Sequence, residues 1–220
     1  MMPESLNTLM ERRFRGLNSG SASEVWREIS KYGKKLFDKG YMVSHSGNIS
    51  VRVGDKMYIK RRGAAADEIG PEDVVEVDLF EEDSSILLSS SETMVHRSIY
   101  LNTSALAVVH AHPPYSIVCS LIFDEIIPMD AEGDYVLRKI PVLVVKEVSG
   151  SKELEEKVSE ALKHYKGVVV RGHGTFAAAK LLEEAYHITC MIEASSQIRY
   201  LVHTSGIAPK RDKTAEFTRW

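Results

Sequence analysis

The sequence predicts a single domain of the α/β or α+β class. Helical and extended segments alternate along the whole chain, with no internal repeat and no interior linker rich in proline, glycine or serine. The chain has 220 residues, and one domain typically holds about 100–200. We therefore expect one domain over residues 1–220, with its core at about 22–203 and a charged tail at 208–220.

The first elements expected are a helix and a hairpin. The helix begins near Ser23 and stops at Gly40. Its apolar residues recur three or four positions apart, at Val25, Ile29, Tyr32, Leu36 and Phe37. Two short apolar runs, 49–53 and 57–59, then flank a Gly-Asp turn at 54–55, which is typical of a β-hairpin.

The later elements follow from the same periodicities and from helix-starting or strand-breaking residues. Serines favour the start of a helix, and a proline pair ends a strand and can open a helix. In chain order we expect a strand at 74–79, an acidic turn at 81–83, an apolar segment at 86–88 leading into the serines of 89–91, a helix at 92–101, a strand at 105–112, a helix from 113–114 to 122, a strand at 142–148, a helix at 152–165, strands at 168–171 and 175–180, and a helix at 182–202.

The composition is that of an ordinary globular protein and excludes several functional classes. Charged residues make up 27% and hydrophobic residues 44%, and the net charge is −3, so no excess of basic residues points to nucleic acid. The longest apolar runs are far shorter than the ~18 residues that span a bilayer, and the N-terminus lacks the apolar stretch of a signal peptide. We expect a cytoplasmic protein in which Cys119 and Cys190 form no disulfide.

Three histidines are the strongest candidates for a metal site. His110 and His112 end the strand at 105–112, where side chains two positions apart project from the same face. His173 lies between two glycines, which let the backbone turn sharply. Three imidazoles with one open position are typical of a catalytic zinc site. The alternative is a surface or hydrogen-bonded pair, which is the more common meaning of an isolated His-x-His pattern.

Glu92 has two interpretations. Near a metal, its carboxylate would be a fourth ligand, a general base, or each in turn. Alternatively, Ser89 and Glu92 match a helix capping box, in which the glutamate binds the amide of the N-cap residue. His96 lies one helical turn after Glu92, where it could support the site indirectly. The remaining histidines have no companion motif, and we interpret them as structural: His45, His164, His187 and His203.

Three short segments are candidates for anion binding. They combine hydroxyl or amide donors, a guanidinium group and glycines that allow close backbone approach. Taken alone, each segment indicates only a turn. The segments are Gly47-Asn48, Arg62-Gly63 and Ser90-Ser91.

Four segments occur together in an order that resembles the class II aldolase/adducin family. They are Ser-Gly-Asn-Ile-Ser at 46–50, Ser-Ser-Glu at 90–92 with His96, Val-Val-His-Ala-His-Pro at 108–113 and Gly-His-Gly at 172–174. The resemblance runs from about residue 24 to 202 and is strongest to members that cleave L-fuculose 1-phosphate. It implies three layers, with a central, mostly antiparallel sheet flanked by helices, and a C4 homotetramer with active sites between subunits.

The resemblance also assigns roles to residues. It implies that one zinc ion per subunit is bound by His110, His112 and His173, and that Glu92 closes the resting metal site and then acts as the base. Manganese, cobalt or iron could replace zinc, because imidazole and carboxylate ligands discriminate poorly among these metals. The phosphate-binding positions that it implies, to which we add Arg62, are Gly47, Asn48, Gly63, Ser90 and Ser91.

Two positions depart from the pattern of this family. The segment Lys60-Arg61-Arg62 stands before the glycine where the fuculose-phosphate aldolases have small hydroxyl residues, so the cations either enter the anion pocket or point outward. Glu132 stands near the position of a tyrosine that reaches a neighbouring active site in those enzymes. Glu132, with Asp130 beside it, is therefore a candidate acid on the aldehyde side.

The activity that the resemblance implies is reversible cleavage of L-fuculose 1-phosphate, or a similar ketose 1-phosphate, into dihydroxyacetone phosphate and a lactaldehyde-like aldehyde. Zinc would stabilise the enediolate as charge develops, with Glu92 as base. Alternatives in the family are a ribulose-5-phosphate 4-epimerase, a methylthioribulose-1-phosphate dehydratase and a related decarboxylase. A non-catalytic, adducin-like binding module is a remote alternative, because all three histidines and Glu92 are present.

Overall fold

The computed structural model describes residues 22–81 and 84–209. The strands are β1 (Asn48–Val53), β2 (Lys56–Lys60), β3 (Val74–Asp78), β4 (Ala107–Ala111), β5 (Glu125–Ile126), β6 (Ile140–Leu143), β7 (Gly167–Val170) and β8 (Gly174–Ala179). The helices are α2 (Ala22–Asp38), α3 (Thr93–Asn102), α4 (Pro114–Ile122), α5 (Ala131–Val136), α6 (Lys152–Ala161) and α7 (Leu182–Ser205), with short 3-10 helices η1 (Pro71–Asp73) and η2 (Ser84–Leu87).

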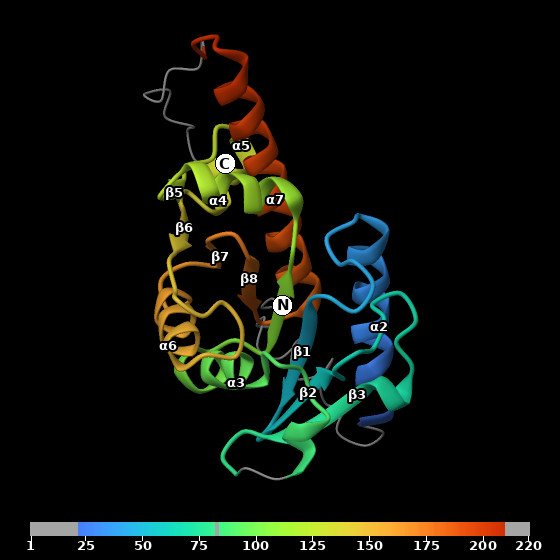
Figure 1. Ribbon diagram of the computed structural model, residues 1–220. Helices are drawn as coiled ribbons and strands as arrows, with labels where there is room; N and C mark the ends of the chain where they lie inside the picture. The colour runs from blue at the N-terminus through green and yellow to red at the C-terminus, as the bar shows by residue number, and fades with distance from the viewer. Residues whose placement is uncertain (1–21, 82–83, 210–220) are drawn as a thin grey trace, which may run out of the picture.

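The strands form one eight-stranded sheet between two layers of helices (Figure 1), which confirms the expected fold class. The strand order is β3-β2-β1-β4-β8-β7-β6-β5. All neighbours are antiparallel except β6 and β7, which run parallel. The sheet is therefore mostly antiparallel, as the family resemblance implies.

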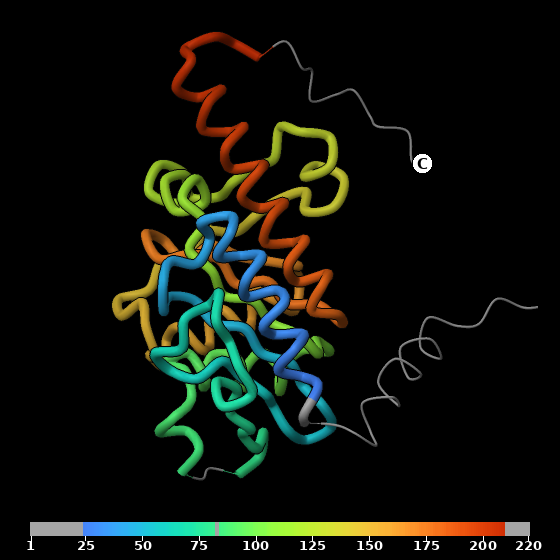
Figure 2. Tube along the Cα trace, turned by 90° about the vertical axis from the view of Figure 1, so that its right-hand side faces the viewer, coloured from blue at the N-terminus to red at the C-terminus, as the bar shows by residue number. Residues whose placement is uncertain are grey.

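Alternating side chains of the strands divide the hydrophobic core between the two faces of the sheet. On β4, Val109 packs with residues of α2 and α7, whereas Val108 packs with residues of α3 and α6. Helices α2 and α7 lie side by side over one face (Figure 2), and α3 and α6 lie together over the other (Figure 1). A third cluster joins α4 and α7 to β5, β6, β7 and β8.

Helix α2 confirms the helical spacing of its apolar residues. Val25, Ile29, Tyr32 and Leu36 are all buried, because residues three and four apart share the face that packs on the sheet.

The structure differs from the prediction mainly between residues 123 and 151. The expected strand at 142–148 is wrong in its extent, since β6 ends at Leu143 and both Val144 and Val148 are exposed. There the chain leaves the sheet and forms a loop before α6. Strand β5 and helix α5 were not predicted, because an element of two or six residues is too short to show a periodicity.

Three further expectations concern the cysteines, membrane crossing and the tail. Cys119 is buried, Cys190 is half-buried, and neither belongs to a disulfide. None of the helices that the structure describes is long and apolar enough to cross a membrane. The tail beyond residue 209, including Phe217 and Trp220, lies outside the described residues.

Candidate functional site

Several strands of the sheet begin or end close together. In an antiparallel pair, the end of one strand lies beside the start of its neighbour, so β2 and β4 end beside the starts of β1 and β8. Asn48, the first residue of β1, is paired with His110 near the end of β4. A β-bridge between Arg61 and Ser89 brings residues 60–63 beside residues 89–92.

A cavity of about 220 Å³ lies beside these strand ends. It is smaller than the pockets that bind drug-sized ligands. The predicted metal and phosphate residues that line it are Gly47, Asn48, Arg62, Gly63, Ser90, Ser91, Glu92, His110, His112 and His173. The lining also contains His45, Ser46 and Ser149, for which we predicted no role in the site. It further contains Lys60 and Arg61, for which the sequence left open whether they enter the anion pocket or point outward. Glu132 is exposed in the first turn of α5 and is not part of the lining.

The three histidines converge in this cavity. One ring nitrogen from each histidine lies within 4.8 Å of those from the other two, and Nε2 of His110 lies 3.1 Å from Nε2 of His112. Nδ1 of His110 contacts the backbone oxygen of Thr175 at 3.0 Å. Outer hydrogen bonds of this kind fix the orientation of a metal-ligating imidazole.

The glycines on either side of His173 permit this convergence. Gly172 has a φ of 69°, which other residues rarely adopt. A Cβ at Gly174 would clash with the backbone oxygen of Ala111 and would lie 2.7 Å from Cδ2 of His112. Glycine is therefore required there for the loop of His173 to approach His112.

The residues of the cluster fit a divalent metal. Burial lowers the pKa of His112 to about 4, and the pKa values of His110 and His173 are lowered as well, chiefly by burial. All three rings are therefore neutral at pH 7, which is the form that binds metal. Nδ1 of His173 is buried and has no hydrogen-bond partner in the described part of the chain, so the site lacks a protein group that would satisfy it.

Glu92 is buried beside this cluster but does not belong to it. Its Oε1 accepts a hydrogen bond from Oγ of Ser149 at 2.8 Å, and the backbone amide of Gly150 donates to the same carboxylate. Oε2 is buried and has no hydrogen-bond partner among residues 22–81 and 84–209. Burial raises the pKa of Glu92, although these two donors oppose the change. A carboxyl group with a raised pKa is suited to exchange protons near neutral pH.

The capping-box interpretation of Glu92 is wrong. Glu92 is itself the N-cap residue of α3, and its side chain makes no capping hydrogen bond. It instead reaches the loop before α6, 57 positions along the chain. Oγ of Ser90 accepts a hydrogen bond from the Glu92 amide. Ser90 thus accepts a hydrogen bond at the start of α3, whereas the Glu92 carboxylate lines the cavity.

His96 lies behind the cavity rather than in its lining. Its ring is fully buried, and Nδ1 lies 2.7 Å from Oγ of Ser50, which also contacts the hydroxyl of Tyr100. Burial lowers the pKa of His96 to about 3, so the ring is neutral. His96 thus lies outside the lining, and an indirect role in the site stays a prediction.

The far end of the cavity is basic. Lys60 is buried, and its ammonium group donates to the backbone oxygens of Ala64 at 2.7 Å and His45 at 3.1 Å. Burial lowers its pKa to about 8, so it is still mostly charged at pH 7. The side chain of Arg61 binds Asp73, with Nη2 2.6 Å from Oδ1.

Arg62 differs from both neighbouring cations. It is exposed, and its guanidinium has no polar partner in the described part of the chain. The sequence left open whether Lys60 enters the pocket or points outward, because no motif distinguishes a buried lysine at the end of a strand from an exposed one.

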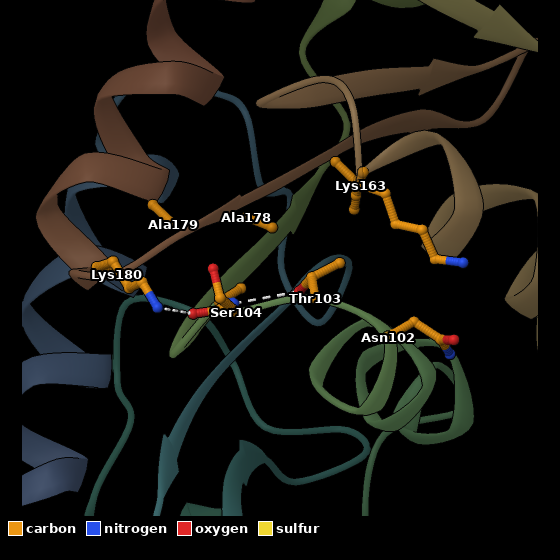
Figure 3. Close-up of a pocket in the computed structure, with 9 residues that line it drawn as sticks. Asn102, Thr103, Ser104, Lys163, Ala178, Ala179 and Lys180 are labelled. Carbon is orange, nitrogen blue, oxygen red and sulfur yellow. Dashed lines mark hydrogen bonds between the residues drawn. The ribbon is translucent and has the colours of Figure 1, made fainter.

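A larger depression elsewhere contains none of the predicted site residues (Figure 3). It measures about 380 Å³ and lies between the ends of α3, α6 and β8. Both of its lysines have partners, because Lys163 binds Glu160 and Lys180 binds the backbone oxygen of Ser104. The described residues that line this depression include neither a carboxylate nor a histidine.

Comparisons with known proteins show the family of this chain. The Class II Aldolase and Adducin N-terminal domain family matches residues 27–200. An L-fuculose phosphate aldolase of Methanococcus maripaludis is 31% identical over 179 residues, which are 80% of this chain and 96% of that protein. The solved structure of L-fuculose-1-phosphate aldolase from Thermus thermophilus matches with a TM-score of 0.79 at 33% identity, covering 86% of this chain and 99% of that one. A methylthioribulose-1-phosphate dehydratase of Danio rerio is 24% identical, and the match covers 92% of this chain and 94% of that enzyme.

Proposed function

Because the chain belongs to the class II aldolase and adducin family, we propose that it is a metal-dependent aldolase acting on L-fuculose 1-phosphate or a similar ketose 1-phosphate. The observation that supports this most strongly is a single cavity lined by three histidines, a buried carboxylate and a basic end. The products would be dihydroxyacetone phosphate and an aldehyde. The same residues argue against a non-catalytic, adducin-like binding module.

His110, His112 and His173 would hold the metal, for which we propose zinc. When bound there, a divalent metal supplies Lewis-acid polarisation of the oxygens of the substrate. The protein contributes neutral imidazoles and a fixed orientation for His110 through Thr175.

Glu92 would move the proton at carbon 3 of the dihydroxyacetone phosphate part. In the condensation direction its carboxylate removes a proton from this carbon, and in the cleavage direction it returns one. Cleavage of the C3–C4 bond leaves the electron pair on carbon 3. Carbon 4 becomes the aldehyde carbon when its hydroxyl group loses a proton. Glu132 of the partner subunit is our candidate for receiving that proton, because Glu132 is exposed and does not line the cavity of its own chain.

The basic end would bind the phosphate group. Lys60 and Arg62 supply positive charge, and Gly47, Asn48, Gly63, Ser90 and Ser91 are the proposed hydrogen-bonding and close-contact positions. We also propose a single domain, a cytoplasmic location and a homotetramer whose active sites lie between subunits.

Methylthioribulose-1-phosphate dehydratase is the second candidate, and the coverage of the Danio rerio enzyme favours it over the epimerase and the decarboxylase. Its substrate is also a ketose 1-phosphate, so the same basic end would serve. The reactions differ in outcome, because a dehydratase releases water and leaves the carbon chain intact. The epimerase and the decarboxylase stay predictions from the family resemblance.

The deciding experiment measures dihydroxyacetone phosphate released from L-fuculose 1-phosphate by the purified protein, with a chelator, without it, and with added zinc. We expect release that the chelator abolishes and zinc restores. Absence of release by folded, zinc-loaded protein, both from L-fuculose 1-phosphate and from a panel of other ketose 1-phosphates, would contradict the aldolase. The same sample would then be tested for water loss from methylthioribulose 1-phosphate.

A further inference from the structure

We propose that Ser149, with the amide of Gly150, is a positioning residue that holds the Glu92 carboxylate outside the histidine cluster and so sets how Glu92 divides between metal ligand and base. The inference rests on the proposed function, because it concerns the base of that reaction. It assigns a role to the loop between β6 and α6, for which sequence patterns predicted none.

One oxygen of the Glu92 carboxylate has a hydrogen-bond partner and the other has none in the described part of the chain. Its Oε1 accepts the hydrogen bond from Ser149 at 2.8 Å, and the Gly150 amide donates to the same carboxylate. Oε2 is buried without a hydrogen-bond partner in the part of the chain that the structure describes. The loop thus binds the Glu92 carboxylate, which lines the cavity, and leaves Oε2 without a protein partner in the described part of the chain.

The two positions of Glu92 compete. A carboxylate bound by the loop does not belong to the cluster formed by the three histidines. A carboxylate that closes a metal site must instead give up at least part of its contact with Ser149. Each hydrogen bond from the loop therefore favours the free base at the expense of the metal-bound state.

The loop is fixed by bonds that do not involve Glu92. Oγ of Ser151 accepts from the amide of Leu154, which caps α6, and the amide of Lys146 donates to Glu153. A Cβ at Gly150 would lie 3.1 Å from the backbone oxygen of Ser91, so the loop packs closely on this segment. Removal of the Ser149 hydroxyl should therefore leave the loop in place, and its effect should pass through Glu92.

The test compares Ser149→Ala and Ser149→Thr with Val148→Ala, which shortens an exposed side chain of the same loop and removes no hydroxyl. Zinc is titrated into metal-stripped protein against a chromogenic chelator, and kcat and KM are measured for dihydroxyacetone phosphate release. A hydrogen bond to a charged group typically corresponds to about tenfold in an equilibrium constant. We expect Ser149→Ala to bind zinc about tenfold more tightly and to lose about tenfold in kcat with KM unchanged.

The controls make the outcome decisive. Ser149→Thr should keep the zinc affinity and kcat of the wild type, and Val148→Ala should leave both unchanged. The tighter zinc binding of Ser149→Ala should vanish when Glu92→Gln is added. Unchanged or weaker zinc binding by Ser149→Ala would overturn the proposal. If the zinc affinities shift as expected but no variant releases dihydroxyacetone phosphate, the proposed activity is wrong and the role of Ser149 stands.

Discussion

Nδ1 of His110 lies 3.0 Å from the backbone oxygen of Thr175, so this ring nitrogen carries the proton. A carbonyl oxygen can only accept a hydrogen bond. The lone pair of His110 is therefore on Nε2, the atom that faces Nε2 of His112 at 3.1 Å. The pairing of β4 with β8 thus fixes the imidazole tautomer that a metal requires.

Removal of one histidine of the cluster should abolish metal binding. Loss of an outer hydrogen-bonding partner costs about 10–100-fold in metal affinity, so loss of a ligand should cost more than about 100-fold. We expect His110→Ala and His173→Ala to fold but to contain far less metal than the wild type, measured by elemental analysis after dialysis. His164→Ala is the matched control, because His164 is exposed just after α6. Normal metal content in either cluster variant would remove that residue from the site.

Replacement of Glu92 should lower catalysis without destabilising the fold. Glutamine keeps an oxygen that can accept from Ser149, but it cannot take up a proton at pH 7. General acid–base catalysis typically contributes about 10²–10⁴-fold, so kcat of Glu92→Gln should fall at least about 100-fold. The melting temperature should stay near that of the wild type, and Glu76→Gln, an exposed change on β3, should keep full activity. If Glu92→Gln retains turnover, Glu92 is not the base.

Local patterns were sufficient where the relevant partners are close in sequence or repeat along an element. The spacing of Val25, Ile29, Tyr32 and Leu36 predicted α2, and the alternation at the end of β4 predicted that His110 and His112 share a face. The ordered motifs then predicted most of the cavity lining. Register between distant strands was not predictable, because a strand shows which face is apolar but not which strand lies beside it.

Contacts between distant loops could not be predicted from the sequence. Ser149 binds a residue 57 positions away, and Lys60 binds the backbone of His45, 15 positions away. The apolar residues at 142–145 favoured a strand over 142–148, whereas β6 ends at Leu143 and the amide of Lys146 donates to Glu153 of α6 instead. The capping-box pattern was misleading for the same reason, because Ser149, which binds Glu92 instead, is distant in the sequence.

Substrate affinity should depend on the charge of Lys60. Burial lowers its pKa to about 8, so its ammonium group loses the proton as the pH rises through 8. Phosphate esters keep the same charge in this range, since their second pKa is about 6. KM for the ketose 1-phosphate should therefore rise about tenfold between about pH 7 and pH 9.5, with little change in kcat.

Unfolding of the protein would not explain the expected rise of KM with pH. Since the pKa of Lys60 is about 8 in the folded state and 10.5 in the unfolded chain, the unfolded chain binds more protons between these values, and the contribution of this group to the free energy of unfolding rises with pH. Thermal unfolding measured at the same pH values checks this point. A flat KM over the same pH range would show that Lys60 does not contact the phosphate.

Arg61 and Arg62 should respond differently to replacement by alanine. The guanidinium of Arg61 is held by Asp73, with Nη2 2.6 Å from Oδ1, whereas Arg62 has no such partner in the described part of the chain and is exposed at the cavity. A free guanidinium is suited to a phosphate group, because its planar donors match two oxygens at once.

We expect Arg62→Ala to raise KM about tenfold with little change in kcat, since the loss concerns ground-state and transition-state binding equally. Arg61→Ala should lower the melting temperature and leave KM within about twofold of the wild type, since it breaks a partly exposed ion pair of modest stability. Steady-state kinetics and thermal unfolding of the two variants measure both effects. If Arg61→Ala raises KM and Arg62→Ala does not, then Arg62 points outward and the phosphate binds on the side of Arg61.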